Sequence, residues 1–263
     1  MEHHDTMIIK GGYPLSGEIT LREAKNSVSK NMVAALLTAQ TCVLRNVPSI
    51  RDVHIVCDMI RRLGGKATLT ESGDVEISVG EPGTLSAADW AEFASQSRIP
   101  ILLCGPLLAR LGAAVIAIGP RPVDFHIPAL RNFGATIEDR GADGLLLRAL
   151  KLRGCKIRLD YPSVGATEQV LLTAVLAEGV TELSNAAVEP EIMDLIMLLQ
   201  KMGAVISVDT DRVITVTGVG SLRGFFHTAM PDPLEAASWA CAAVSTGGDI
   251  LVRNARQMDL MTF

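Results

Sequence analysis

Aromatic side chains are scarce in this sequence. Phe, Trp and Tyr make up 4% of its 263 residues, whereas hydrophobic residues of all kinds make up 48%. The apolar mass therefore consists mainly of Ala, Val, Leu and Ile, which suit closely packed helices and strands. This composition and length favour an α/β protein with one large domain or two medium ones.

A basic surplus is also missing. The sequence has 24 Lys and Arg against 29 Asp and Glu, which gives a net charge of −5 and an isoelectric point near 5.6. Such a balance argues against a general nucleic-acid binder, which usually shows a basic patch. A small phosphate-bearing substrate stays compatible with it, because a few well-placed Arg and Lys can hold an anion in an acidic protein.

Long apolar runs, a secretory leader and paired cysteines are absent too. The most apolar stretch, residues 99–119, is interrupted by Pro100, Pro106 and Arg110, which argues against a membrane span. The first residues, MEHHDTM, lack the basic and apolar plan of a signal peptide. We therefore expect a cytoplasmic protein without a membrane segment, metal or cofactor. The scattered cysteines, none of which forms a CxxC pair, are Cys42, Cys57, Cys104, Cys155 and Cys241.

What the sequence does contain is a long internal repeat. Three amphipathic segments each end in an apolar residue followed by a glycine, and a β-prone stretch comes next. The three glycines, Gly64, Gly134 and Gly203, are almost evenly spaced. Asn46 precedes Gly64 by the same interval as Asn185 precedes Gly203. The regular spacing indicates that three copies of one structural unit follow each other, with turn chemistry as the simplest role of the glycines.

A fourth copy begins in AAVSTGGDILVRNA, where Asn254 takes the place of Asn46 and Asn185. At the same interval after Asn254, its closing glycine would come near position 272, beyond the last residue at 263. We therefore expect one complete three-unit globule and part of a second.

Each unit is predicted to have the order βαβαββ. Three such units can bury their helices only by turning them towards a common centre, with the sheets outside. The expected helices cover 26–38 and 52–63 in the first unit, 93–111 and 123–133 in the second, and 165–177 and 190–202 in the third.

Functional residues are expected where the units depart from their shared pattern. Lys25 and Asn26 stand at the start of the first helix, where free backbone N–H groups and the helix dipole favour an anion. Ser163, Val164 and Gly165 take the same place in the third unit, and small residues there allow a ligand close to the backbone. The simpler alternatives are a solvated lysine at an ordinary helix start and plain N-capping by Ser163.

Two arginines are further candidates. In GPRPVDFH, two prolines fix the backbone around Arg121, which limits the entropy lost when that arginine grips a phosphate or carboxylate. Arg98 precedes a very apolar helix in SQSRIPILL, so it is either a surface charge or a cation directed into a cleft.

Together these segments resemble the enolpyruvyl transferase family, and within it the members that act on UDP-N-acetylglucosamine. The matching pieces cover essentially the whole chain and occur in the family's order. They are GGYPLSGEITLREAKN, SRIPILLCGPLLARLG, GPRPVDFHI, SVGAT, AAVEPEIMD, MGAVISVDTDRV and GGDILVRNA.

The resemblance implies an inside-out α/β barrel, with two globules of three βαβαββ units and substrate bound between them. Residues 22–219 would form the first globule, and 1–21 with 220–263 part of the second. The residues it assigns to phosphoenolpyruvate are Lys25, Arg98 and Arg121, and those it assigns to the UDP-sugar are Asn26, Pro122, Val123, Asp124, Phe125, Ser163, Val164 and Gly165.

The implied reaction transfers an enolpyruvyl group from phosphoenolpyruvate to a hydroxyl of UDP-N-acetylglucosamine, the first step of peptidoglycan synthesis. Two alternatives remain open: a non-catalytic or regulatory homologue that keeps the UDP-sugar cradle, and an enolpyruvyl transferase for another acceptor. Both are favoured by the lack of the family's loop cysteine, since no cysteine lies between Cys104 and Cys155. Tyr161 also stands where the family has a lysine. A second chain could supply the rest of the second globule.

Overall fold

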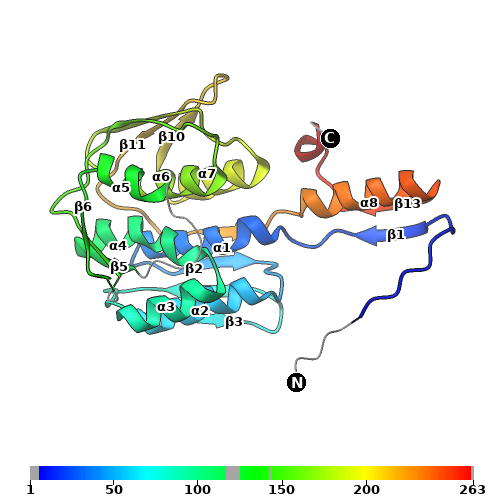
Figure 1. Cartoon of the computed structure of the whole chain (residues 1–263), viewed down its shortest axis with the longest axis horizontal. Coiled ribbons are helices and arrows are strands. Elements are labelled where there is room, and N and C mark those ends of the chain that lie inside the picture. The colour runs from blue at the N-terminus through cyan, green and yellow to red at the C-terminus, as the bar shows by residue number, and fades with distance from the viewer. Residues whose placement is uncertain (1–5, 117–124, 142–143, 262–263) are drawn as a thin grey trace. The chain divides into compact units, whose positions relative to one another are not determined.

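The computed structural model describes residues 6–116, 125–141 and 144–261 (Figure 1). The chain divides into a larger unit, residues 23–230, and a smaller unit made of the two ends, residues 1–22 and 231–263. The expected second boundary, after residue 219, is therefore corrected to residue 230. The reason is β12, Phe226–Thr228, which pairs in parallel with β2, Cys42–Arg45, and so belongs to the larger unit.

The first repeat has a four-stranded sheet in the order β12-β2-β4-β3. Its helix α2 turns Val53, Val56, Met59 and Ile60 into the core, as the apolar spacing of the sequence predicts. The helix expected over 26–38 is an α-helix only as far as Ala34, and the next three residues form a short 3-10 turn. The elements are α1 Lys25–Ala34, the 3-10 turn Ala35–Leu37, α2 Arg51–Arg62, β3 Lys66–Leu69 and β4 Val75–Ser78.

The third repeat has the same construction. Its strand order, β8-β9-β11-β10, matches that of the first sheet position by position, again with the first pair parallel and the other pairs antiparallel. This agreement confirms the βαβαββ unit. The elements are β8 Lys156–Arg158, α6 Val164–Ala174, β9 Val180–Ser184, α7 Pro190–Lys201, β10 Val205–Val208 and β11 Ile214–Thr217.

The second repeat is less regular. Its described strands form a three-stranded sheet in the order β5-β7-β6. The single helix expected over 93–111 is instead broken into α3, a 3-10 segment containing Pro100, and α4. A proline ring cannot continue an α-helix from the preceding turn, which explains the break. The elements are α3 Ala87–Gln96, the 3-10 segment Ile99–Leu103, α4 Cys104–Leu111, β5 Ala113–Ile116, α5 His126–Asn132, β6 Thr136–Asp139 and β7 Leu145–Arg148.

The residues that mark the repeat share one backbone conformation. Asn46 and Asn185 both follow a strand and have φ angles of 55° and 56°. This left-handed region is rare for residues with a side chain, and asparagine tolerates it better than most. The closing glycines Gly64, Gly134 and Gly203 also have positive φ angles, of 86°, 94° and 102°. The repeat seen in the sequence is thus a repeat of turns that need these residue types.

Helices α1 and α6 lie inside the larger unit, whereas α2 and α3 lie at its lower edge in the view of Figure 1 and each expose one face. Every residue of α6 from Ala166 to Ala174 is buried, whereas β2, β3 and β4 alternate buried and more exposed positions. A strand with that alternation covers the core with one face and meets water with the other. None of the described helices is long and apolar enough to span a membrane.

The smaller unit contains the first strand of the chain. β1, Ser16–Thr20, pairs in parallel with β13, Asp249–Arg253, and α8, Pro233–Thr246, connects to β13 through a left-handed Gly247. Asn254 follows β13 with a φ angle of 62°, as Asn46 and Asn185 follow their strands. The unit is therefore the start of a further repeat.

Candidate functional site

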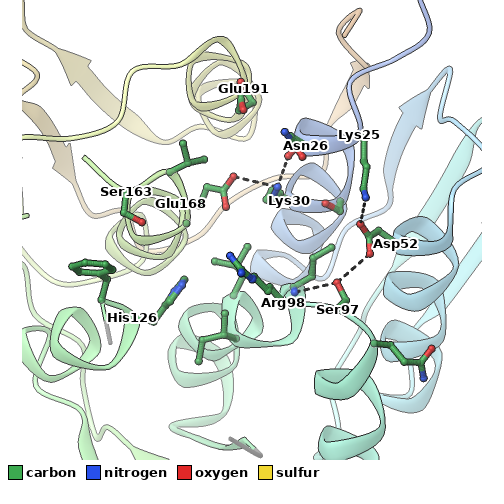
Figure 2. A pocket seen from close by; sticks show the side chains of 18 of the residues that line it. Lys25, Asn26, Lys30, Asp52, Ser97, Arg98, His126, Ser163, Glu168 and Glu191 are labelled. Atoms are coloured by element: carbon green, nitrogen blue, oxygen red, sulfur yellow. Dashed lines mark hydrogen bonds and ion pairs between the residues drawn. The ribbon is translucent and has the colours of Figure 1, made fainter. Parts of the chain in front are cut away.

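A pocket of about 820 Å³ lies in the larger unit where α1 and α6 begin (Figure 2). The segments around it belong to all three repeats. It brings together every expected site residue that the structure describes, which are Lys25, Asn26, Arg98, Phe125, Ser163, Val164 and Gly165. The other four expected residues, Arg121, Pro122, Val123 and Asp124, lie outside the described residues.

The start of α1 is not capped by a side chain. Ala24 occupies the N-cap position, and its own N–H donates to the carbonyl oxygen of Met230. The Lys25 ammonium lies 3.5 Å from the Asp52 carboxylate, and the Ser97 hydroxyl donates to the other oxygen of Asp52 over 3.1 Å. With 62% of its side chain exposed, Lys25 is free to exchange this partner for an anionic ligand.

The start of α6 is capped in the predicted way. The Ser163 hydroxyl accepts a hydrogen bond from the Ala166 N–H at 3.3 Å, so the N-capping role is confirmed. Gly165 lies against His126: a Cβ atom built on it would stand 3.4 Å from the imidazole ring. The absence of a side chain at 165 thus leaves backbone and imidazole side by side at the pocket wall.

His126 contributes a neutral ring. Burial lowers the pKa of His126, and a hydrogen bond with Gln169 opposes that shift. Within the described part of the chain, its Nδ1 atom has no hydrogen-bond partner. A buried imidazole that is uncharged at neutral pH has one donor and one acceptor nitrogen, and with Gln169 on one of them only one is left for a polar ligand.

The pocket also contains an ion pair that was not predicted from the sequence. Lys30 donates to the Asn26 carbonyl oxygen over 2.5 Å and lies 3.6 Å from the Glu168 carboxylate. This pair joins α1 to α6 beneath the two helix starts. Its one sequence signal is a charge within a run of small and apolar residues, in SVSKNMV and GATEQVL.

The pocket holds both acids and bases, and two pairs of them face each other, Lys25 with Asp52 and Lys30 with Glu168 (Figure 2). Lys25 extends along the wall formed by α1 and α2, and Arg98 projects in from the segment before Ile99–Leu103. Glu168 and Glu191 come from α6 and α7 on the other side. A ligand with an anionic end near Lys25 and Arg98, and with hydroxyl or amide donors near Glu168 and Glu191, would match this arrangement.

The cysteines give the site no nucleophile among the described residues, since none of them lines the pocket. Cys104 is fully buried, and burial raises the pKa of its thiol. Cys104 is therefore an inert core residue.

Comparison with known proteins decides the family. The pattern of the family described as EPSP synthase (3-phosphoshikimate 1-carboxyvinyltransferase) matches residues 9–261. The chain belongs to the EPSP synthase family of enolpyruvyl transferases. The resemblance inferred from the sequence motifs is thereby confirmed, together with the α/β fold class.

Two curated relatives of this chain carry the same name. Proteins named UDP-N-acetylglucosamine 1-carboxyvinyltransferase from Protochlamydia amoebophila and Acidiphilium cryptum are 41% and 46% identical to it. These matches cover 98% and 97% of this chain but 58% and 62% of the relatives. The chain therefore spans about three fifths of the length of these curated relatives.

Solved enolpyruvyl transferases share the fold. The enolpyruvyl transferase NikO from Streptomyces tendae superposes with a TM-score of 0.78 at 23% identity, over 88% of this chain and 55% of NikO. EPSP synthase from Acinetobacter baumannii superposes with a TM-score of 0.70 at 20% identity, over 88% of this chain and 53% of the synthase. At these identities the likeness concerns the fold alone.

Proposed function

We propose that this chain forms the nucleotide-sugar-binding part of an enzyme that transfers an enolpyruvyl group from phosphoenolpyruvate to a hydroxyl of UDP-N-acetylglucosamine. One observation carries the proposal: two helix starts, at Lys25–Asn26 and Ser163–Gly165, face one pocket with N–H groups that have no partner within their own helices. The names of the curated relatives supply the substrate class. On this basis we also expect a role in peptidoglycan synthesis in the cytoplasm.

The pocket's groups suit the binding of both substrates. Helix N-termini favour phosphate groups, so the start of α6 is suited to a diphosphate and the start of α1 to phosphoenolpyruvate. Asn26, Phe125 and the Ser163–Gly165 segment would hold the nucleotide sugar. Pro122, Val123 and Asp124 are assigned to the same cradle on sequence grounds.

The proposed chemistry is an addition followed by an elimination. The sugar hydroxyl loses its proton as its oxygen bonds to the central carbon of phosphoenolpyruvate, while the methylene carbon gains a proton and becomes a methyl group. Loss of phosphate together with one proton of that methyl group then restores the double bond. Lys25, Arg98 and, from the sequence, Arg121 would hold phosphate and carboxylate throughout. Fixed cations that match the charge of a tetrahedral intermediate lower the barrier without rearranging.

A titration with UDP-N-acetylglucosamine tests the binding part of this proposal. We expect saturable binding by calorimetry and a loss of affinity of at least tenfold in Asn26→Ala. The matched control is Asn132→Ala, an exposed asparagine at the end of α5. A folded protein that gives no binding heat at millimolar ligand, or equal affinities for both variants, would contradict the proposal.

A non-catalytic UDP-sugar binder is the second candidate function. It is favoured by the sequence between Cys104 and Cys155, which contains no cysteine. Binding of UDP-N-acetylglucosamine without any consumption of phosphoenolpyruvate, even when the remainder of the family's second globule is supplied, would support this candidate over the first.

A further inference from the structure

Glu168 is a buried acid at the wall of the pocket. It lies in the second turn of α6, and its side chain is 3% exposed. One oxygen, Oε1, faces the Lys30 ammonium at 3.6 Å. Among the described residues, the other oxygen makes no hydrogen bond or ion pair. A buried carboxylate with unused acceptor capacity beside a cavity is costly unless something else bonds to it.

Lys30 does not fully compensate that carboxylate. Its ammonium is shared with the Asn26 carbonyl oxygen, which lies nearer, at 2.5 Å. A separation of 3.6 Å from Glu168 exceeds the 2.7–2.9 Å that is typical of a charge-assisted hydrogen bond. The carboxylate therefore keeps room for a stronger donor.

Several charged or titratable groups from other elements line the same pocket. Besides Glu168, which is the one titratable residue of α6, they are Lys25 and Lys30 of α1, Arg51 and Asp52 of α2, Arg98 before the 3-10 segment, His126 of α5, Tyr161 before α6 and Glu191 of α7. Burial raises the pKa of Glu168 to about 7, Lys30 lowers it and the charge of Glu191 raises it further. Near neutral pH this group is thus divided between its acid and its carboxylate form.

We propose that Glu168 is a ligand-binding residue, whose carboxylate accepts a hydrogen bond from a hydroxyl or amide N–H of a nucleotide sugar lying between the starts of α1 and α6. The inference rests on the proposed function. The positions of Lys25 and Arg98 favour it, because these two cations attract the anionic groups away from α6 and leave the sugar or base donors to face α6. Glu168 would then select ligands that carry a donor at this position.

Proton release on ligand binding follows from this proposal. A donor that bonds to the carboxylate stabilises the ionised form, so ligand binding lowers the pKa of Glu168. About half a proton per ligand is then released at pH 7, because about half of the free protein carries the acid form. The affinity rises with pH between 6 and 8, by about fivefold if the pKa falls by one unit. The diphosphate of a nucleotide sugar has no group that titrates in this range.

Calorimetry in two buffers of different ionisation enthalpy measures this proton directly. The ligand is UDP-N-acetylglucosamine at pH 7. We expect release of about half a proton by the unaltered protein and none by Glu168→Gln, which keeps the shape of the side chain. The control is Glu178→Gln, at an exposed glutamate that does not line this pocket, and it should keep the release. In Lys30→Met, a second variant, the pH of half-maximal release should move upward.

Each outcome has one meaning. Binding without proton release, proton uptake, or equal release by Glu168→Gln and the unaltered protein would overturn the role of Glu168 while leaving the proposed function intact. Absence of any binding in both buffers would contradict the proposed function, and this inference would fall with it.

Discussion

Asp194 of α7 and His227 of β12 lie 3.0 Å apart in the core of the larger unit. Lys201 approaches the opposite ring nitrogen, Nδ1, also at 3.0 Å. Because an ammonium only donates, Nδ1 must accept, and the neutral ring must donate from Nε2 to Asp194. The Ser27 hydroxyl and the Asn31 amide of α1 donate to the other oxygen of Asp194, at 2.5 and 2.8 Å. Asp194 thus holds the helix that carries Lys25, Asn26 and Lys30.

Asp194→Asn should destabilise the protein by about 3 kcal/mol, because it leaves buried donors without their charged acceptor. Asp58→Asn, at an exposed aspartate paired with Arg61, is the control and should change little. Denaturant unfolding measures both. Equal unfolding free energies for the two variants would contradict the assigned role of Asp194.

The ionisation of Asp194 makes the free energy of unfolding depend on pH. Burial alone would raise the pKa of Asp194, but the bonds from His227, Ser27 and Asn31 outweigh that effect and lower it. A lowered pKa in the folded state means that stability is present above the ordinary value of 3.8 and lost as the pH falls below it. Between pH 2 and 5, the stability of Asp194→Asn should vary less with pH than that of the unaltered protein.

Lys25→Ala should weaken binding of phosphoenolpyruvate by about tenfold, the usual effect of losing one charge-assisted hydrogen bond. Lys156→Ala makes a matched control, since Lys156 is an exposed lysine that also faces a carboxylate, that of Glu182 at 3.4 Å. The affinity is best followed by calorimetry at two salt concentrations. If both variants bind alike, Lys25 does not contact the ligand.

The reactivity of each cysteine thiol should decrease as its burial increases. Cys241 is exposed, whereas Cys42, Cys57 and Cys104 are buried, and burial raises the pKa of each of these three thiols. Iodoacetamide should therefore modify Cys241 first and leave Cys104 unmodified in the folded protein. Fosfomycin, the epoxide that alkylates the loop cysteine in this family, should leave any activity intact. A fosfomycin adduct on Cys104, found by mass spectrometry, would refute this account of its burial.

Residues 1–263 alone should not consume phosphoenolpyruvate. The smaller unit has two described strands and helix α8, whereas the family's active site closes between two complete globules. By the resemblance, the general base and a further arginine belong to the remainder of the second globule. A phosphate-release assay with both substrates should show turnover only when a polypeptide carrying that remainder is added. Turnover by this chain by itself would place the general base within it.

Much of the fold could be predicted from the sequence, because its signals are local. Gly64 and Asn46 mark turns that their own backbone conformations require, and the apolar spacing of α2 specifies its buried face. The boundary after 219 was wrong because β12 joins the larger unit through a parallel partner, β2, which lies near the other end of the chain. No local pattern encodes such a pairing.

The site was predictable in part for a similar reason. Lys25 and Ser163 stand at helix starts, which a sequence reveals. Lys30 and Glu168 lie inside helices, where a charge usually faces water. Only the packing of α1 against its neighbours shows that Glu168 is buried, that Lys30 is half-buried and that the two charges face each other.

A crystal structure with UDP-N-acetylglucosamine bound would test the central claim most directly. We expect the ligand to lie between the starts of α1 and α6, with Asn26 and the Ser163–Gly165 backbone within hydrogen-bond distance of it. A donor of the ligand should lie within hydrogen-bond distance of Glu168. A ligand bound at saturating concentration anywhere else, with this pocket unchanged, would contradict the account.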